Sequence, residues 1–331
     1  MANLLSSLKI KNLKIKNRIV MPPLASKAAT KTGMVTERLL KQYKNRPEVG
    51  MIVVEHSYVR REGRVNNQQL GIYDESHVEG LAKLAHIIRN NGSVAAIQLS
   101  HGGSASKPHI LGRNAFAPSE VIHPGRDIGE FPTALDKEDL IELKRSFVKA
   151  ALRAKKAGFN LVELHGAHGY LLNQFMSPLT NKRNDEYGGN LENRLRFPLE
   201  VINAVRGAVG SKYPIAYRLG CDDFLEGGVT VDEAIKAAKM IEEAGIDLLD
   251  LSGGLKGYTA AGNEEGFFVY LGEAIKPEVQ VPVIVTGGIK NPEYANKIVK
   301  EGKTDLVGVG RAMLKDKNWA QKAIEKIKNN M

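Results

Sequence analysis

Two histidines and a tyrosine lie close together in the sequence, directly after an apolar run. His165, His168 and Tyr170 belong to the stretch HGAHGYLL, and the apolar run covers residues 160–164. The chain holds 8 histidines in 331 residues, so this stretch concentrates side chains that can donate hydrogen bonds. Imidazole donors beside a phenol suit a site that holds a carbonyl oxygen, stabilises negative charge as it develops there and supplies a proton.

Two other interpretations of the histidine pair stay open. His165 and His168 could bind a metal ion, although a zinc site needs a third ligand with suitable geometry. They could also be structural histidines whose hydrogen bonds are satisfied within the fold. Imidazole pairs at this spacing occur for many reasons, and we expect no metal here.

Glycines follow two further apolar runs near the end of the chain. Gly287 and Gly288 come after one run, and Gly310 and Arg311 come after the next. Glycine lets the backbone approach an anion, and the N terminus of a following helix adds partial positive charge. An arginine can add a bidentate contact. The pattern predicts a phosphate site, and the structural alternative is a pair of tight turns.

Gln98 and Arg218 could recognise a planar heterocycle next to that phosphate. The amide of Gln98 can pair with a ring imide, and a guanidinium stabilises negative charge on the ring. A phosphate together with a ring that becomes anionic suggests FMN. The alternative for Arg218 is a buried ion pair with Asp222, Asp223 or Glu192.

Eight apolar, β-branched runs alternate with amphipathic helical stretches. The runs begin at residues 19, 50, 94, 160, 215, 247, 281 and 305, and the helical stretches cover 76–91, 136–157, 191–208, 230–244, 291–301 and 313–328. Continuous hydrophobic runs are typical of parallel strands covered on both faces. An open nucleotide-binding sheet would carry G-x-G-x-x-G after its first strand, and this chain lacks it there. We predict an α/β fold, a (β/α)8 TIM barrel, as a single domain over residues 1–331.

The carboxyl ends of the strands in such a barrel meet on one face, where function is built. We therefore expect the residues at the strand ends to lie together. They are Pro22, Pro23, Leu24, Ala25, His56, Gln98, His165, His168, Tyr170, Arg218, Ser252, Gly287, Gly288, Gly310 and Arg311. Residues 102–135 form the longest irregular stretch, and we expect them to form a loop over the mouth of the barrel.

Composition narrows the class of protein. Hydrophobic residues make up 43% of the chain and charged residues 25%, as in a globular protein with a large core. The single cysteine, Cys221, excludes an internal disulfide and a thiolate metal site within the chain. The net charge of +10 comes from lysines and arginines scattered along helices, so we expect no nucleic-acid partner. The sequence shows no secretory signal and no membrane span, so we expect a cytoplasmic protein.

Nearly the whole chain resembles the Old Yellow Enzyme family of FMN-dependent ene-reductases. The stretches that carry the resemblance are KNRIVMPPL, IQLSHGG, HGAHGYLLNQFMSPLTNKRNDEYGGNLENRLRF and DLVGVGRAML. The resemblance implies that NADH or NADPH reduces FMN, which passes hydride to the β-carbon of an α,β-unsaturated carbonyl compound. His165 and His168 would then hold the carbonyl oxygen, and Tyr170 would protonate the α-carbon.

The same resemblance implies further contacts. Gln98 and Arg218 match residues that touch the flavin ring, while Gly287, Gly288, Gly310 and Arg311 match its phosphate region. Family members are commonly dimers or tetramers, so the resemblance also implies a homo-oligomer.

The chain departs from the family pattern at a few positions. Ala25 and Lys27 stand where close relatives have cysteine and tyrosine, and His56 stands where a small residue is usual. The stretch RLGCDDFLEGG resembles instead the barrel domain of 2,4-dienoyl-CoA reductases and trimethylamine dehydrogenase. Three alternatives therefore stay open: an enoyl or dienoyl thioester reductase, a flavin barrel acting on tRNA, and a flavoprotein that only binds.

Overall fold

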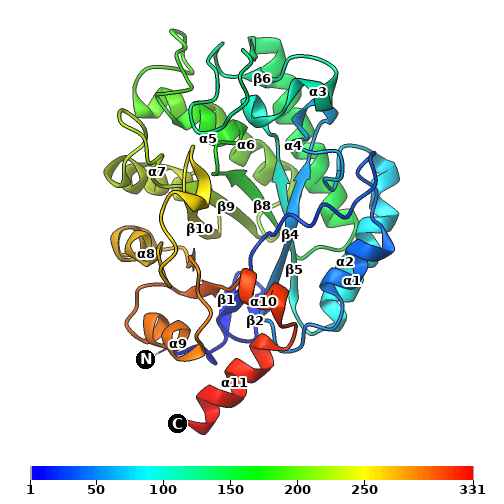
Figure 1. Ribbon diagram of the computed structural model, residues 1–331, viewed down its shortest axis with the longest axis vertical. Helices are drawn as coiled ribbons and strands as arrows, with labels where there is room; N and C mark the ends of the chain where they lie inside the picture. The colour runs from blue at the N-terminus through cyan, green and yellow to red at the C-terminus, as the bar shows by residue number, and fades with distance from the viewer. Residues whose placement is uncertain (1, 331) are drawn as a thin grey trace.

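The computed structural model describes residues 2–330, and its centre is a closed barrel of parallel strands (Figure 1). Around the barrel the order is β10, β11, β12, β3, β4, β5, β8, β9 and back to β10. Their bounds are Ile19–Met21 (β3), Met51–Tyr58 (β4), Val94–Ser100 (β5), Leu161–Gly166 (β8), Ile215–Gly220 (β9), Leu248–Ser252 (β10), Val283–Thr286 (β11) and Leu306–Gly308 (β12). Each strand corresponds to one of the eight predicted runs, with β4 ending one residue beyond its run, which confirms the predicted (β/α)8 barrel.

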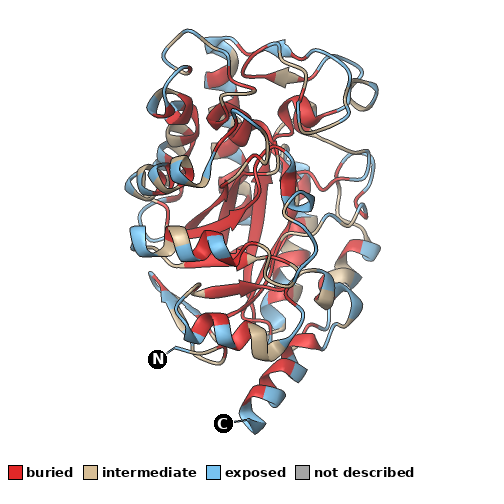
Figure 2. Ribbon diagram, turned by 60° about the vertical axis from the view of Figure 1, so that its left-hand side comes forward, coloured by how far each residue is buried: buried red, intermediate tan, exposed pale blue. Residues whose placement is uncertain are grey.

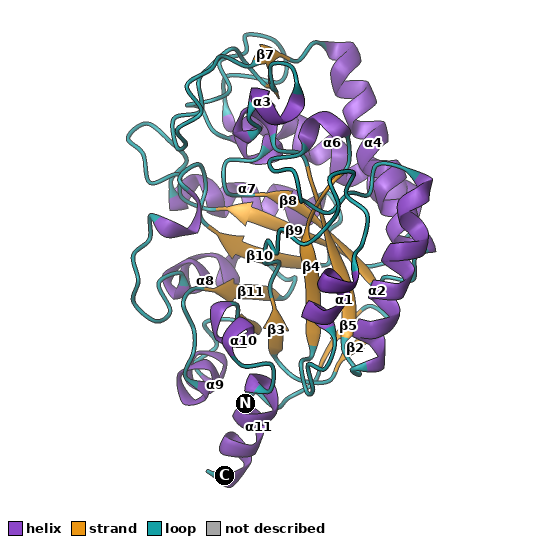
Figure 3. Ribbon diagram, turned by 45° about the vertical axis from the view of Figure 1, so that its right-hand side comes forward, coloured by secondary structure: helices purple, strands orange, loops and turns teal. Residues whose placement is uncertain are grey.

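Helices surround the strands (Figure 3). The outer helices are Glu37–Tyr43 (α1), Val78–Asn90 (α2), Lys137–Lys156 (α4), Leu191–Val209 (α6), Val231–Glu243 (α7), Val269–Ile275 (α8), Pro292–Lys300 (α9) and Trp319–Asn329 (α11). Shorter helices cover Pro108–Leu111 (α3), Leu171–Met176 (α5) and Arg311–Lys315 (α10). The predicted helical stretches correspond to α2, α4, α6, α7, α9 and α11. The sequence did not show α1 and α8, because seven residues carry too little periodicity.

A small hairpin closes the lower end of the barrel. Its strands, Leu8–Ile10 (β1) and Leu13–Ile15 (β2), pair antiparallel and were not predicted. Lysines alternate with apolar residues in this segment, so one face can be buried while the other meets water. Ile10 and Ile15 are buried and pack with residues of the barrel interior, such as Leu161 and Leu306. The hairpin thus acts as an apolar plug beneath the strands (Figure 1).

Inside the barrel, the side chains change from apolar to polar along each strand. Residues two apart on a strand point to the same face. The lower interior layer includes Ala96, Leu161, Ala216, Leu248 and Ile284, all buried. The next layer holds Gln98, Glu163, Arg218, Asp250 and Thr286 at the following interior positions. The strands are buried along their length (Figure 2), so this polar layer lies inside the protein at the carboxyl ends of the strands.

The irregular stretch 102–135 contains more structure than expected. It includes α3 and two short strands, Phe116–Ala117 (β6) and Thr133–Ala134 (β7), which pair parallel. Figure 1 shows α3 and β6 at the upper end of the molecule, beyond the carboxyl ends of β5 and β8. A loop at this place matches the expectation of a cover for the barrel mouth. Within residues 2–330, no helix combines the length and the apolar character that a membrane crossing requires.

Candidate active site

The structure brings the histidines and the tyrosine of HGAHGYLL together at the end of β8. The ring centres of His165 and His168 are 5.0 Å apart, and those of His165 and Tyr170 are 4.9 Å apart. His56, from β4, lies edge-on to Tyr170 at 5.5 Å. His168 has a φ of 59°, a left-handed conformation that is uncommon outside glycine, and its N–H donates to the carbonyl of Gly253. A strained backbone thus directs His168 toward His165.

A chain of polar contacts joins Arg218 to His168. The guanidinium of Arg218 donates to the hydroxyl of Ser252 at 3.3 Å, and this hydroxyl lies 2.7 Å from Nε2 of His168. Arg218 also forms a buried ion pair with Asp250, with Nε 3.2 Å from Oδ2. Arg218 therefore does form a buried ion pair, as the alternative interpretation expected. Its partner is Asp250, however, and not Asp222, Asp223 or Glu192. Register explains this, because Asp250 on β10 stands directly beside Arg218 on β9.

Gln98 is also held by a residue that the sequence did not single out. Its Nε2 donates to Oε1 of Glu163 at 2.8 Å, and both side chains are buried. Burial raises the pKa of Glu163 to about 8, with the negative charge of Asp250 adding to the effect. Burial also raises the pKa of Asp250, to about 6, against the opposing attraction of Arg218. The two shifts favour a protonated Glu163 beside an Asp250–Arg218 ion pair near neutral pH.

The histidines of the site are neutral at pH 7. Burial lowers the pKa of His165 well below its usual value, and the neighbouring His168 and Arg218 lower it further. Burial likewise lowers the pKa of His168, with the positive charges of Arg218 and Arg126 acting in the same direction. For His56, burial and the same arginines lower the pKa to about 4. A neutral imidazole keeps one N–H, so each ring can donate one hydrogen bond.

Several buried polar atoms at the barrel mouth have no hydrogen-bond partner within residues 2–330. They include Ser100 Oγ, Glu163 Oε2, His165 Nδ1, Asp250 Oδ1 and Thr286 Oγ1. Arg218 Nε also makes no hydrogen bond and meets Asp250 only as an ion-pair partner at 3.2 Å. Buried polar groups are almost always paired, so such a concentration indicates a place for a polar ligand. The ligand must offer both donors and acceptors, because the set contains carboxyl oxygens, ring nitrogen and guanidinium. A flavin ring, with its imide, carbonyls and ring nitrogens, fits this set.

The remaining predicted residues lie at the ends of β3, β11 and β12. A side chain added at Gly310 would meet that of Leu24 at 3.2 Å, so these two strand ends are adjacent. Gly287 packs against the backbone of Phe268, with an added Cβ only 2.8 Å from its nitrogen, and Gly288 has a φ of 67°. The close approach and the left-handed backbone require glycine at both positions.

Among these strand-end residues, Pro22 is buried, Pro23 and Leu24 are half-buried, and Ala25 and Arg311 are exposed. No contact joins Arg311 to the histidine cluster within residues 2–330. The structure places Arg311 at the first position of α10, directly after Gly310.

One buried carboxylate ties three of the loops at this face together. Asp223 accepts hydrogen bonds from the hydroxyl of Ser177, the N–H of Val229 and the N–H of Leu255. Ser177 follows α5, and Leu255 follows β10, so the contacts link segments far apart in the sequence. This fixes the loops beside the histidines.

Sequence reasoning also missed Arg126, which belongs to the stretch 102–135. It donates from Nη2 to the carbonyl of His168 at 2.7 Å, and its guanidinium lies 5.2 Å from the ring centre of Tyr170. Nothing in the local sequence around Arg126 indicates this contact, because it depends on how the covering loop folds back. A long loop with many glycines and prolines was the only signal.

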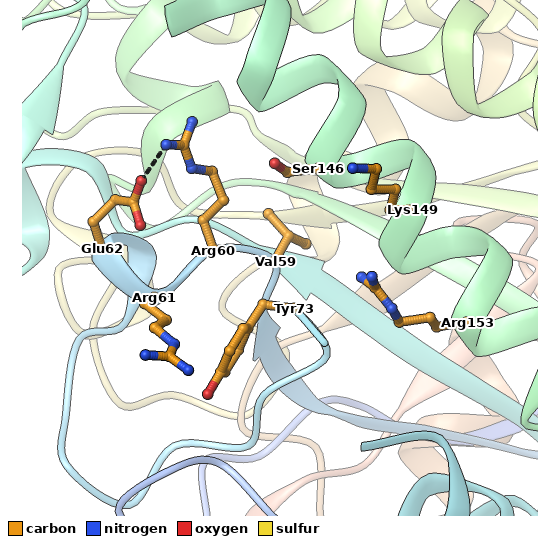
Figure 4. A pocket seen from close by; sticks show the side chains of 8 residues that line it. All are labelled: Val59, Arg60, Arg61, Glu62, Tyr73, Ser146, Lys149 and Arg153. Atoms are coloured by element: carbon orange, nitrogen blue, oxygen red, sulfur yellow. Dashed lines mark ion pairs between the residues drawn. The ribbon is translucent and has the colours of Figure 1, made fainter. Parts of the chain in front are cut away.

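Two hollows lie away from the histidine cluster. One, of about 250 Å³, is lined by Val59, Arg60, Arg61, Glu62, Tyr73, Ser146, Lys149 and Arg153 (Figure 4). Its positive charge is partly balanced, since Arg60 pairs with Glu62 and Arg153 pairs with Glu75. The second is lined by residues of 118–121, 134–136 and 182–185. Among residues 2–330 there is no group of three or more histidine, cysteine or acidic side chains that could hold a metal ion.

The chain is similar to known flavin enzymes along its whole length. The model of the NADH:flavin oxidoreductase / NADH oxidase family matches residues 3–330. NADH oxidase from Thermoanaerobacter brockii is 43% identical, covering 99% of this chain and 52% of that protein. NADPH dehydrogenase from Bacillus cytotoxicus is 38% identical, covering 98% of this chain and 92% of that protein. The chain therefore spans about half the length of the first relative and almost all of the second.

Solved structures agree with the sequence matches. A 2-naphthoyl-CoA reductase in complex with 2-naphthoyl-CoA superimposes with a TM-score of 0.93 at 30% identity, covering 98% of this chain and 52% of that one. An Old Yellow Enzyme homologue from Zymomonas mobilis gives a TM-score of 0.87 at 26% identity, covering 98% and 93%. The resemblance seen in the sequence is thus confirmed. The chain belongs to the NADH:flavin oxidoreductase / NADH oxidase family, whose members are FMN-dependent NAD(P)H oxidoreductases.

Proposed function

We propose that this protein uses NADH or NADPH to reduce the C=C bond of α,β-unsaturated carbonyl compounds. The observation that carries the proposal is the group formed by His165, His168 and Tyr170 at the barrel mouth, beside a polar layer in which several atoms have no hydrogen-bond partner within residues 2–330. Two neutral donors next to a phenol match the needs of a reaction that places negative charge on a carbonyl oxygen and a proton on carbon.

The residues that would hold FMN come from several strand ends. Gln98 and Arg218 would contact the ring, and His56 and Ser252 would lie beside it. Pro22, Pro23, Leu24 and Ala25 would line the ring at the end of β3, and Gly287, Gly288, Gly310 and Arg311 would hold the phosphate. When bound, FMN supplies the hydride acceptor for NAD(P)H and the hydride donor for the alkene.

The protein's own residues would then act on the substrate. His165 and His168 donate hydrogen bonds to the carbonyl oxygen and draw electron density away from the double bond. The hydroxyl of Ser252, 2.7 Å from Nε2 of His168, holds one of these rings in place. Tyr170 supplies a proton to the α-carbon. Burial raises the pKa of Tyr170 above its usual value, so the phenol is protonated at neutral pH and can act as a general acid.

A second candidate is the reduction of enoyl or dienoyl thioesters of CoA. It is favoured by the likeness to a reductase whose structure holds 2-naphthoyl-CoA and by the net charge of +10, which would attract CoA phosphates. Action on tRNA and a purely binding role have no comparable support. A homo-oligomer, as in the family, is part of the proposal, and light scattering on the purified protein tests it.

One experiment separates the candidates. The protein is loaded with FMN, bleached anaerobically with NADPH and mixed with either 2-cyclohexenone or crotonyl-CoA. Rapid return of the flavin band with cyclohexenone supports the first proposal, and return only with crotonyl-CoA supports the second. If neither compound restores the band, the protein is not an ene-reductase of either type.

A further inference from the structure

Arg126 reaches the site from the loop over the barrel mouth. Its Nη2 donates to the carbonyl of His168 at 2.7 Å, and its guanidinium lies over the ring of Tyr170, 5.2 Å from the centre. The Nε of Arg126 is buried and has no hydrogen-bond partner within residues 2–330. The guanidinium thus contacts the backbone of one proposed donor and the ring of the other, with donor capacity left over.

The charge of Arg126 has no counter-ion. No carboxylate lies within ion-pair distance of it among residues 2–330, whereas Arg218, the other guanidinium of the site, is paired with Asp250. The histidines nearby are neutral because their pKa values are lowered. The site therefore carries one uncompensated positive charge. A partly buried cation without a partner is costly, and an anionic ligand group would supply the missing partner.

We propose that Arg126 binds an anionic group of the substrate, so that the site prefers α,β-unsaturated carbonyl compounds that carry a carboxylate near the reacting double bond. This inference rests on the proposed ene-reductase function. The position of Arg126 supports a substrate contact, because it touches the two residues assigned to the carbonyl oxygen and the α-carbon. The glycines assigned to the cofactor phosphate follow β11 and β12, and no hydrogen bond joins them to Arg126 within residues 2–330.

The test uses two alkenes that react alike and differ in charge, N-ethylmaleimide and N-(carboxymethyl)maleimide. Alkylation of the protein does not interfere, because the single cysteine, Cys221, is fully buried. The variants are R126M, which removes the charge, and R126K, which keeps it. R113M is the matched control, since Arg113 is an exposed arginine of the same loop that stacks on Phe116.

The wild type should favour the carboxymethyl compound. R126M should lower kcat/KM for that compound by about 10-fold or more, the usual size for a hydrogen bond to a charged group. The value for N-ethylmaleimide should fall by a clearly smaller factor, because R126M also removes the hydrogen bond to the His168 carbonyl. R126K should recover part of the loss, since lysine keeps the charge but not the planar fork, and R113M should change neither value. Binding of the two saturated succinimides, followed through the flavin spectrum, should show the same preference without turnover.

Other outcomes would overturn the inference. Equal loss for both maleimides in R126M, at unchanged FMN content, would make Arg126 a structural support of Tyr170 and His168. A loss confined to the KM for NADPH, but not NADH, would assign Arg126 to the 2′-phosphate of the reductant. If the wild type reduces neither maleimide while cyclohexenone restores the flavin band, the substrate inference fails alone. If no alkene restores the band, the proposed function fails with it.

Discussion

The roles of the two histidines at the end of β8 can be tested by mutation. Replacing both His165 and His168 by alanine removes the donors proposed for the carbonyl oxygen, while the contacts of Gln98 and Glu163 stay in place. Reoxidation of the bleached flavin by cyclohexenone should slow by about 100-fold or more, as for loss of preorganised oxyanion donors. FMN content should be unchanged. The matched control is H86A, which removes an exposed histidine on α2; wild-type rates in the double variant would refute the role of the pair.

Tyr170 permits a separate test, because a proton donor acts in only one half of the reaction. The variant Y170F should slow flavin reoxidation by the enone by about 10-fold or more, within the range for general acid catalysis. Flavin reduction by NADPH should change far less. Stopped-flow measurement of the two half-reactions compares these effects directly. Equal slowing of both would show that Tyr170 shapes the pocket and does not deliver the proton.

The pH dependence follows from the neutral state of the histidines. The pKa values of His165 and His168 are lowered well below 6.5. Both rings are therefore mainly neutral at pH 6, and their charge does not change as the pH rises. The histidines should therefore contribute no change to the rate of reoxidation by cyclohexenone between about pH 6 and 7.5. The titration of Asp250, whose pKa is about 6, falls at the lower end of this range, so the rate should be level from about pH 7 to 7.5. A required imidazolium with an ordinary pKa would instead lose activity about tenfold per pH unit above 6.5. Above pH 7.5 the rate can also change because Glu163, whose pKa is about 8, begins to ionise.

At the scale of elements, the start of α10 is the place to test the phosphate assignment. Arg311 and Lys315 are both exposed and stand at opposite ends of this helix. The variant R311A should weaken FMN binding by about 10-fold, as expected for the loss of one charged contact. K315A removes the same charge one turn away and should leave the affinity unchanged. Titration of the protein stripped of flavin measures both, and equal affinities for R311A and wild type would remove Arg311 from the phosphate site.

The elements also show what a sequence can and cannot predict. All eight barrel strands were predicted, because parallel strands buried on both faces read as unbroken apolar runs. The turns after β11 and β12 could also be predicted, because they require glycine and the sequence shows glycine there. The β1–β2 hairpin was missed, because its alternating lysines resemble a charged surface segment and its partner in the barrel interior lies far along the chain.

The same limit applies to the site. His165, His168 and Tyr170 could be predicted because they are neighbours in sequence at the end of one strand. Glu163 and Asp250 escaped notice, since each looks like an ordinary strand residue until the register places it beside Gln98 or Arg218. Local spacing thus reveals residues on one strand, whereas contacts across strands require the fold.

In the whole molecule, a closed barrel, a polar interior layer and a covering loop that carries Arg126 would together form the proposed flavin site. The polar layer lies above an apolar plug and below a covering loop, so a bound ring would meet unpaired polar atoms and a reacting substrate would meet His165, His168 and Arg126. Each part has a separate test, but all depend on the cofactor.

The most direct measurement is the visible spectrum of the purified protein under anaerobic conditions, first with NADH or NADPH and then with cyclohexenone. We expect a flavin band that bleaches with the reduced nicotinamide and returns with the enone. A protein that stays colourless after incubation with FMN, or a band that NADH and NADPH both leave unchanged, would show that this barrel is not an NAD(P)H-dependent flavin reductase.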